Sequence, residues 1–209
     1  MTEGFIQTDF DTRMMIHTLT PMSLAQLHDD WISPEEYIES ELKSEVRHEY
    51  LGGRVYSMPG ASEEHNVVAG NIFAAFHAHL RGKPCRVFMN DMKCRIQSVG
   101  RDVFYYPDVM VTCGPRGEPR YFKRDPVIIF EVLSPDTEST DRREKFFAYT
   151  SIPTLEAYIL VEQEKVGVTA FRRAGEGWAT EVIEGGEAVL QLPRIEMELP
   201  LALIYEEVL

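Results

Sequence analysis

An acidic residue inside a strongly apolar segment is the feature that most restricts how this chain can fold. Pro126–Leu133 reads PVIIFEVL, a β-branched and aromatic run that is typical of a strand buried on both faces. Glu131 lies within this run, after four apolar residues. An ionised carboxylate is costly to bury unless it is protonated, paired or bound to a metal, so the fold has to provide one of these conditions.

A second acidic residue, Asp108, stands in a shorter apolar segment, Tyr106–Val111. Side chains alternate along a strand, so Asp108 shares a face with Met110, and Glu131 shares a face with Ile129. If the two strands pair, the carboxylates can meet. Neither strand contains a lysine, and oxygen ligands of this kind suit Mg²⁺ or Mn²⁺. The alternative is that either acid lies at a strand end and faces water.

The composition is that of a soluble globular protein. The 209 residues, 44% hydrophobic and 26% charged, suffice for one ordinary domain with a good core. No apolar run approaches the roughly 20 residues that a membrane span needs. The first residues lack the basic segment and apolar core of a secretory signal, so we expect a cytoplasmic protein with no membrane partner.

The cysteines give no sign of a metal site. Cys85, Cys94 and Cys113 are odd in number and lack the close paired spacing of zinc ligands. We therefore expect all three to be reduced residues of the core or the sheet.

The net charge of −13 argues against a surface that binds nucleic acid without specificity, because such binding depends on Lys and Arg neutralising phosphates. The charge is uneven, however. The segment from Ala174 to the end contains eight glutamates and only one basic residue, Arg194. A basic patch elsewhere on the chain therefore stays open.

The order of expected elements indicates an α/β fold with a mixed sheet. Residues 1–20 show no sustained period and are expected to form a flexible leader, with residues 21–209 as one domain. We expect helices at 23–31, 34–42, 62–80 and 141–149, the last with Asp141 and Glu144 as a capping box. Strands are expected at 54–58, 85–89, 92–96, 106–111, 126–133, 155–161, 166–173, 177–183 and 188–192, with 85–96 as a hairpin.

A set of motifs, each weak alone, runs through residues 20–209. In chain order they are Arg47, Glu49 and Gly53, then His65 at a helix start, Pro107-Asp108, Glu131–Pro135, and Asp141, Lys145, Tyr149 and Tyr158. Together they resemble the Uma-type restriction endonuclease family, long catalogued as a domain of unknown function within the PD-(D/E)XK nuclease superfamily. The resemblance implies a restriction-endonuclease-like α/β core, a mixed β-sheet flanked by helices, and DNA cleavage with Mg²⁺ or Mn²⁺.

The resemblance also implies roles for single residues. Asp108 and Glu131 would be catalytic metal ligands, with Val132 as a third metal-binding residue and Glu49 as an additional catalytic acid. The superfamily pattern places a lysine two residues after the second acid, where this chain has Leu133. The resemblance suggests that Lys145 reaches the site from the following helix instead. Taken alone, Lys145 reads as an exposed helix charge.

Three functions are consistent with these residues. The leading hypothesis is a Mg²⁺-dependent DNA endonuclease that hydrolyses phosphodiester bonds. The second is a nuclease-like binding or structural protein without catalysis, which the acidic charge and the missing strand lysine favour. The third is a metal-dependent phosphohydrolase acting on small nucleotides. Because cutting a duplex requires two antiparallel cuts, we also expect a homodimer.

Overall fold

The computed structural model describes residues 31–58, 60–98, 101–115, 117, 119–134 and 138–209. The chain divides into Met1–Trp31 and Ile32–Leu209, and the fold described here is that of the second part. The expected leader, and all of the helix expected at 23–31 except Trp31, lie outside the described residues.

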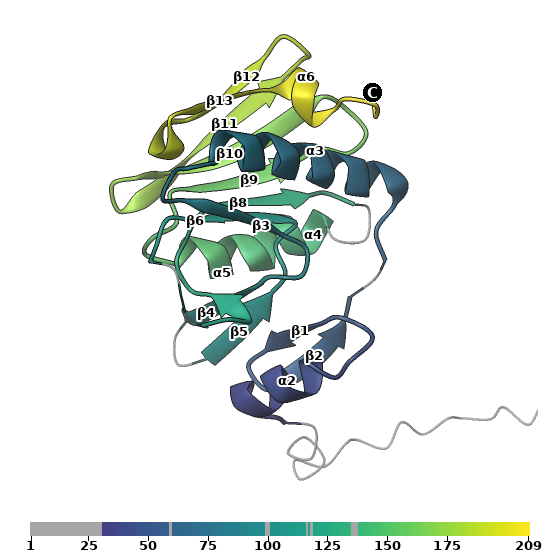
Figure 1. Cartoon of the computed structure of the whole chain (residues 1–209), viewed down its shortest axis with the longest axis vertical. Helices are drawn as coiled ribbons and strands as arrows, with labels where there is room; N and C mark the ends of the chain where they lie inside the picture. Colours follow the sequence, from purple (N-terminus) through teal and green to yellow (C-terminus); the bar gives the residue numbers. More distant parts are fainter. Residues whose placement is uncertain (1–30, 59, 99–100, 116, 118, 135–137) are drawn as a thin grey trace, which may run out of the picture. The chain divides into compact units, whose positions relative to one another are not determined.

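The elements follow one another in an order that mixes strands and helices (Figure 1). The helical elements are α2 (Pro34–Glu41), α3 (Glu63–His79), α4 (Glu138–Thr140), η1 (Asp141–Lys145), α5 (Phe146–Thr150), η2 (Pro193–Ile195) and α6 (Leu201–Ile204). The strands are β1 (His48–Leu51), β2 (Arg54–Ser57), β3 (Arg86–Met89), β4 (Lys93–Ser98), β5 (Arg101–Tyr105), β6 (Val109–Thr112), β7 (Phe122–Lys123), β8 (Pro126–Val132), β9 (Ala157–Val161), β10 (Gly167–Ala174), β11 (Gly177–Glu184), β12 (Val189–Leu192) and β13 (Met197–Pro200).

A six-stranded mixed sheet carries the core, in the order β11-β10-β9-β8-β6-β3. Its β8–β9 pair is parallel, and the other neighbours in it are antiparallel. Every residue of β8 and of β9 is buried. This burial on both faces explains why β8 reads as a continuous apolar run, and it confirms that Glu131 lies inside the protein.

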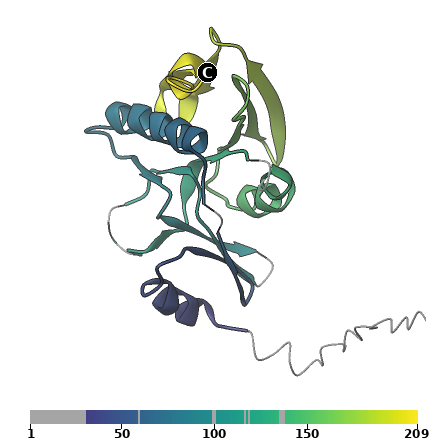
Figure 2. The same cartoon turned by 90° about the vertical axis from the view of Figure 1, so that its right-hand side faces the viewer.

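Helices and strands cover both faces of this sheet (Figures 1 and 2). On one face, α3 packs through Val68, Ile72 and Phe76 in the same core as β12, β13 and α6. On the other face, α5 contributes Tyr149 to a second core that includes residues of β4 and β5. The α/β architecture with a mixed sheet flanked by helices is therefore confirmed.

A five-stranded sheet in the order β2-β1-β5-β4-β7 lies beside the second core. The β1–β2 hairpin turns at Gly52 and Gly53, whose φ values of 58° and 108° lie in the region that favours glycine, as the Gly-Gly pair indicates. Behind β1, Tyr37 of α2 packs on Tyr50 and Phe104.

The hairpin expected at 85–96 is wrong. Strand β3 pairs with β6 in the six-stranded sheet, whereas β4 pairs with β5 and β7 in the other sheet. The turn between them passes from one sheet to the other, and Asn90 donates its N–H to the Asp108 carbonyl at 3.2 Å. Two adjacent strands joined by a short turn usually pair, but here each finds a longer-range partner.

Helix starts were well indicated by the sequence. Ser33 and Glu36 form a capping box at α2, and the Ser62 hydroxyl accepts the His65 N–H at the start of α3. The capping box expected at Asp141 is wrong, because the helix begins earlier, at Glu138, and Asp141 lies buried inside it.

The expectation of three reduced cysteines is also wrong. Cys85 and Cys113 form a disulfide, and Cys94 is buried and free. The antiparallel register of β3 with β6 pairs Arg86 with Thr112. Cys85 precedes Arg86 and Cys113 follows Thr112, so the two cysteines lie opposite each other at the end of this strand pair. In the part of the chain that the structure describes, no helix is long and apolar enough to cross a membrane.

Candidate active site

The pairing of β6 with β8 brings the two predicted acids together. The register aligns Val109 with Phe130, and continuing it by one residue places Asp108 opposite Glu131. The Val132 N–H donates to Asp108 Oδ2 at 2.7 Å, which ties the end of one strand to the other. Both carboxylates line the same cavity. The prediction that these strands are neighbours with their acids in one cleft is confirmed.

Glu131 is the most deeply buried of these acids, with 2% of its surface exposed. Its Oε1 atom accepts hydrogen bonds from the Tyr149 hydroxyl at 2.8 Å and from Lys145 Nζ at 3.3 Å. Burial raises the pKa of Glu131 well above its usual value, and this outweighs the opposing effect of the Lys145 charge.

Lys145 is buried and lies among three carboxylates. Its Nζ atom is 3.0 Å from Asp141 Oδ1, 3.3 Å from Glu131 Oε1 and 3.6 Å from Glu49 Oε1. Burial disfavours the ammonium, but the three acids outweigh it and raise the pKa of Lys145 well above its usual value. The lysine therefore carries its charge inside the protein.

The local helix geometry presents this lysine to the site. Residues Asp141–Lys145 form a π-helical turn between two α-helical segments. Such turns are rare and occur frequently at functional sites. The turn buries both of its end residues, Asp141 and Lys145, and the Tyr158 hydroxyl donates to the Asp141 carbonyl at 3.0 Å.

Glu49 reaches the same place from the other sheet. It lies in β1, and its side chain is 18% exposed. Burial raises the pKa of Glu49, with Lys145 acting in the opposite direction. The structure thus gathers Glu49, Asp108, Glu131 and Lys145, all predicted from the sequence, around one cavity, which Val132 also lines.

His65 approaches Asp108 from the first turn of α3. Its Nε2 atom is 3.2 Å from Asp108 Oδ2, and its Nδ1 atom is buried with no hydrogen-bond partner among the described residues. Burial lowers the pKa of His65. The hydrogen bond to Asp108 and the charge of that carboxylate raise the pKa by more than burial lowers it, so the pKa of His65 lies above its usual value. In the motif set His65 was identified only as a helix-opening residue, and no role was predicted for it.

Asp141 is the site residue whose role the sequence reasoning missed. It appeared as a motif residue and as a helix cap, whereas its carboxylate contacts the Lys145 ammonium. Its spacing of four residues from Lys145 was the available signal, because residues at that spacing lie on one side of a helix.

The cavity has a volume of about 440 Å³, and both polar and apolar residues line it. Besides the acids and Lys145 it is lined by Arg47 and by Ser62, His65 and Asn66 at the start of α3. That start of a 17-residue helix is the positive end of the helix dipole. The cavity therefore combines buried carboxylates with groups that attract an anion.

The oxygen atoms of the site are of the kind that binds a hard divalent cation, but their positions do not form a ready metal site. Asp108, Glu131 and Glu49 offer carboxylate oxygens, the ligands that Mg²⁺ and Mn²⁺ prefer. Within the described ranges, however, no three His, Cys, Asp or Glu side chains are grouped as a ready metal cage. The Lys145 ammonium lies between Glu49, Glu131 and Asp141. Asp108, which has no ion pair with Lys145, stands opposite Glu131 at the end of the β6–β8 pair, so these two carboxylates are the pair that would hold a cation.

The sheet, the flanking helices and the paired acids define a restriction-endonuclease-like α/β protein. A solved structure from Anabaena variabilis, described as "a putative nuclease belonging to DUF820", has the same fold, with a TM-score of 0.67 and 19% identity over 82% of this chain and 98% of that one. Residues 34–203 match the family model Uma2, "Putative restriction endonuclease". The chain belongs to this family, and the resemblance expected from its motifs is confirmed.

Two relatives from Synechocystis sp. are similar over most of the chain. The uncharacterized protein slr1290 is 37% identical over 147 residues, which is 70% of this chain and 76% of that protein. The uncharacterized protein sll1609 is 26% identical over 167 residues, covering 77% and 92%.

Proposed function

We propose that this protein is a nuclease that hydrolyses phosphodiester bonds in DNA with Mg²⁺ or Mn²⁺. The observation that carries the proposal is the convergence of Asp108, Glu131 and Lys145 on one cavity from three separate elements. Family membership supports it independently. Buried carboxylates and a buried lysine with raised pKa values are typical of catalytic sites.

In this proposal Asp108 and Glu131 hold the cation, and Val132 is the third metal-binding residue through its backbone. The bound metal would polarise the phosphoryl oxygen and activate water. Lys145 supplies a fixed positive charge that orients the attacking water or offsets the developing charge. Glu49 and Asp141 keep the Lys145 ammonium in place.

One wall of the cavity also suits a phosphate group. The start of α3 at Ser62 lines this wall, and the positive end of a helix dipole favours phosphate oxygens. The Arg47 guanidinium lines the same wall, 3.2 Å from Asp91.

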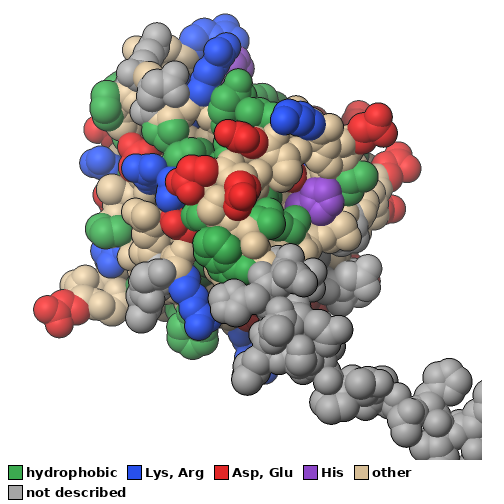
Figure 3. Space-filling view, turned by 90° about the horizontal axis from the view of Figure 1, so that it is seen from below, with side chains coloured by type: hydrophobic (Ala, Val, Ile, Leu, Met, Phe, Trp, Pro, Cys, Tyr) green, Lys and Arg blue, Asp and Glu red, His purple; other side chains and the backbone are tan. Residues whose placement is uncertain are grey.

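A phosphohydrolase that acts on small nucleotides is the second candidate, and the charge of the molecule favours it. The chain has a net charge of −13. On the face shown in Figure 3, acidic side chains gather near the centre, and the described Lys and Arg side chains are scattered and do not form a band. A long nucleic acid would gain little from such a surface.

A paired assay tests both candidates. Supercoiled plasmid and bis-p-nitrophenyl phosphate are incubated with the full chain and Mg²⁺ or Mn²⁺, alongside Asp108→Asn and the exposed control Lys165→Met. Cleavage of plasmid that Asp108→Asn abolishes and Lys165→Met retains supports the DNA nuclease. Cleavage of the small diester alone supports the second candidate. No cleavage of either substrate, with Mn²⁺ binding also absent by calorimetry, contradicts both.

A further inference from the structure

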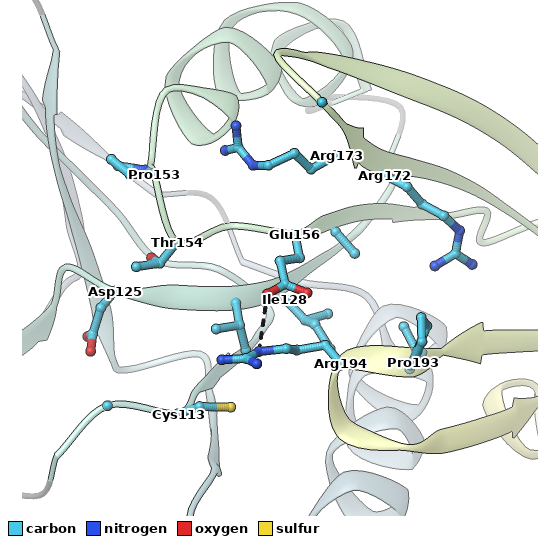
Figure 4. Close-up of a pocket in the computed structure, with 15 residues that line it drawn as sticks. Cys113, Asp125, Ile128, Pro153, Thr154, Glu156, Arg172, Arg173, Pro193 and Arg194 are labelled. Carbon is cyan, nitrogen blue, oxygen red and sulfur yellow. Dashed lines mark ion pairs between the residues drawn. The ribbon is translucent and has the colours of Figure 1, made fainter.

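A buried carboxylate outside the active site joins the two segments that carry acids into it. Glu41 is the last residue of α2, and its side chain is 4% exposed. It lines neither the active-site cavity nor a second cavity of about 770 Å³ at the start of β8, which Figure 4 shows. A buried carboxylate is costly unless hydrogen bonds or charges satisfy it, so its partners indicate what it does.

Glu41 holds the start of β1 at His48. Its Oε1 atom accepts the His48 N–H at 2.9 Å, and its Oε2 atom is 3.1 Å from His48 Nδ1. The Tyr37 hydroxyl, one turn earlier in α2, donates to the His48 carbonyl at 2.5 Å. Strand β5 pairs with β1 only from Tyr50 onward, so side chains of α2 take the place of a strand partner at His48. The residue that follows, Glu49, is therefore held from α2.

The same oxygen atom of Glu41 also holds the segment that leads to Asp108. Glu41 Oε1 accepts the Tyr106 O–H at 2.7 Å. Tyr106 is 3% exposed, and Lys93 Nζ lies over its ring, 4.9 Å from the centroid. Pro107 follows Tyr106, and the proline ring fixes one of the backbone angles between Tyr106 and Asp108. A shift of Tyr106 is therefore transmitted to Asp108.

The two acids that Glu41 holds in this way reach the cavity from different sheets. Glu49 lies in β1 of the five-stranded sheet, and Asp108 directly precedes β6 of the six-stranded sheet. Each makes a contact that depends on its position: Glu49 Oε1 is 3.6 Å from Lys145 Nζ, and Asp108 Oδ2 accepts the Val132 N–H at 2.7 Å. Glu41 bridges the two sheets at a point outside the cavity.

We propose that Glu41 is a positioning residue of the active site: it sets where Asp108, and with it the proposed cation site, lies relative to Glu49. The effect on metal binding rests on the proposed nuclease function, in which Asp108 is a metal ligand. Residues that orient metal ligands from outside typically change metal affinity by about 10–100-fold. The position of Asp108 can also be followed without any metal, because the Val132 N–H donates to it.

Amide spectra of the metal-free full chain test the proposal, with the Val132 signal as the readout. Glu41→Ala removes the contacts to His48 and Tyr106, whereas Glu41→Gln keeps an oxygen that can accept the same N–H and O–H groups. Tyr106→Phe removes only the bridge to the segment before Asp108. Glu39→Ala makes the same change at an exposed residue of the same helix. Mn²⁺ affinity by calorimetry and urea unfolding are measured for every variant.

Glu41→Ala should move the Val132 amide proton upfield, because a displaced Asp108 accepts a weaker hydrogen bond. Tyr106→Phe should move it in the same direction, and the double variant should add little to Glu41→Ala, because both changes break one bridge. Mn²⁺ affinity should fall about tenfold or more in Glu41→Ala. Glu41→Gln and Glu39→Ala should keep the Val132 signal and the Mn²⁺ affinity near the parental values.

Loss of stability in Glu41→Ala with an unmoved Val132 signal would show that Glu41 only anchors α2, and this would overturn the proposal. An equal movement of the signal in Glu39→Ala would overturn it as well. If Glu41→Ala does not fold, an unmoved signal in Tyr106→Phe has the same meaning. A parent that binds no Mn²⁺ and cleaves neither substrate would contradict the nuclease function, whereas the Val132 signals would still decide whether Glu41 positions Asp108.

Discussion

At the scale of single residues, the site is organised by one ammonium group. Lys145 contacts Glu49, Glu131 and Asp141, and no other Lys or Arg is within ion-pair distance of these three carboxylates among the described residues. Buried charges are tolerated when they are paired, and breaking such a set by removing one member is costly. Lys145 is therefore both a candidate catalytic group and a structural counter-ion.

Lys145→Met should lower both stability and activity. We expect the free energy of unfolding to fall by about 3–5 kcal/mol, because three buried carboxylates lose their counter-ion. Cleavage should fall by a factor on the order of 10² or more, while Mn²⁺ binding by Asp108 and Glu131 persists. Urea denaturation, calorimetry with Mn²⁺ and the plasmid assay measure these effects. The exposed control Lys165→Met should cost less than about 1 kcal/mol. Equal losses in the two variants would contradict the central position of Lys145.

Glu131→Gln should change the pH dependence of stability. Because burial raises the pKa of Glu131, the folded protein holds a proton that the unfolded chain has lost above pH about 4.3. The free energy of unfolding of the parent therefore falls as pH rises from that value through the raised pKa. Glutamine removes this titration, so the variant should gain stability relative to the parent as pH increases.

Urea denaturation at several pH values, without divalent metal, measures this difference. Glu184→Gln on exposed β11 serves as the control. A Glu131→Gln difference that stays constant between about pH 4.5 and 7.5 would show that the carboxyl titrates normally in the folded protein.

At the scale of elements, the sequence predicted which segments form strands and helices better than it predicted which strands pair. Glu131 in an apolar run indicated a buried strand, and Ser62 indicated the start of α3, because both signals are local. Pairing is decided by distant residues. The short turn at Asn90 favoured a hairpin, but β3 gains a buried neighbour in β6, and β4 gains one in β5.

The same non-local pairing decides the state of the cysteines, and thiol counting tests it. Alkylation of the unfolded, unreduced chain should label Cys94 alone, because Cys85 and Cys113 are joined. After reduction, all three should react. We expect the double variant Cys85→Ser, Cys113→Ser to lose about 2–4 kcal/mol of stability. Three labelled thiols before reduction would restore the expectation of reduced cysteines.

At the scale of the whole molecule, the strand β8 carries two cavities of different chemistry. The acids at its end were visible in the sequence because a charge interrupts an apolar run. The second cavity, lined by Val127 and Ile128 at the start of β8 and by Arg172 and Arg194 from β10 and η2, was not visible, because its lining residues are far apart in the sequence and follow no pattern. Sites built from unremarkable residues far apart in sequence leave no local pattern to detect.

A homodimer is expected if the protein cuts duplex DNA. Two cuts on antiparallel strands require two sites, and a two-fold dimer provides them in equivalent positions. Light scattering at micromolar concentration measures the mass directly, and twice the 24.0 kDa of one chain is the expected value. A monomeric mass together with efficient duplex cleavage would contradict this expectation.

The π-helical turn at Asp141–Lys145 makes the geometry of the site depend on the number of residues in one helical turn. A π turn holds about one residue more than an α turn, so an extra residue is absorbed there while the helical segments on both sides keep their register. Asp141 and Lys145, at the two ends of the turn, are therefore held at a separation that an ordinary α turn of the same length would not give. Deleting the exposed Arg143 between them would close the turn and change this separation without removing any residue that contacts the ammonium. A change of one residue in length would thus alter the site while every motif residue remained in the chain.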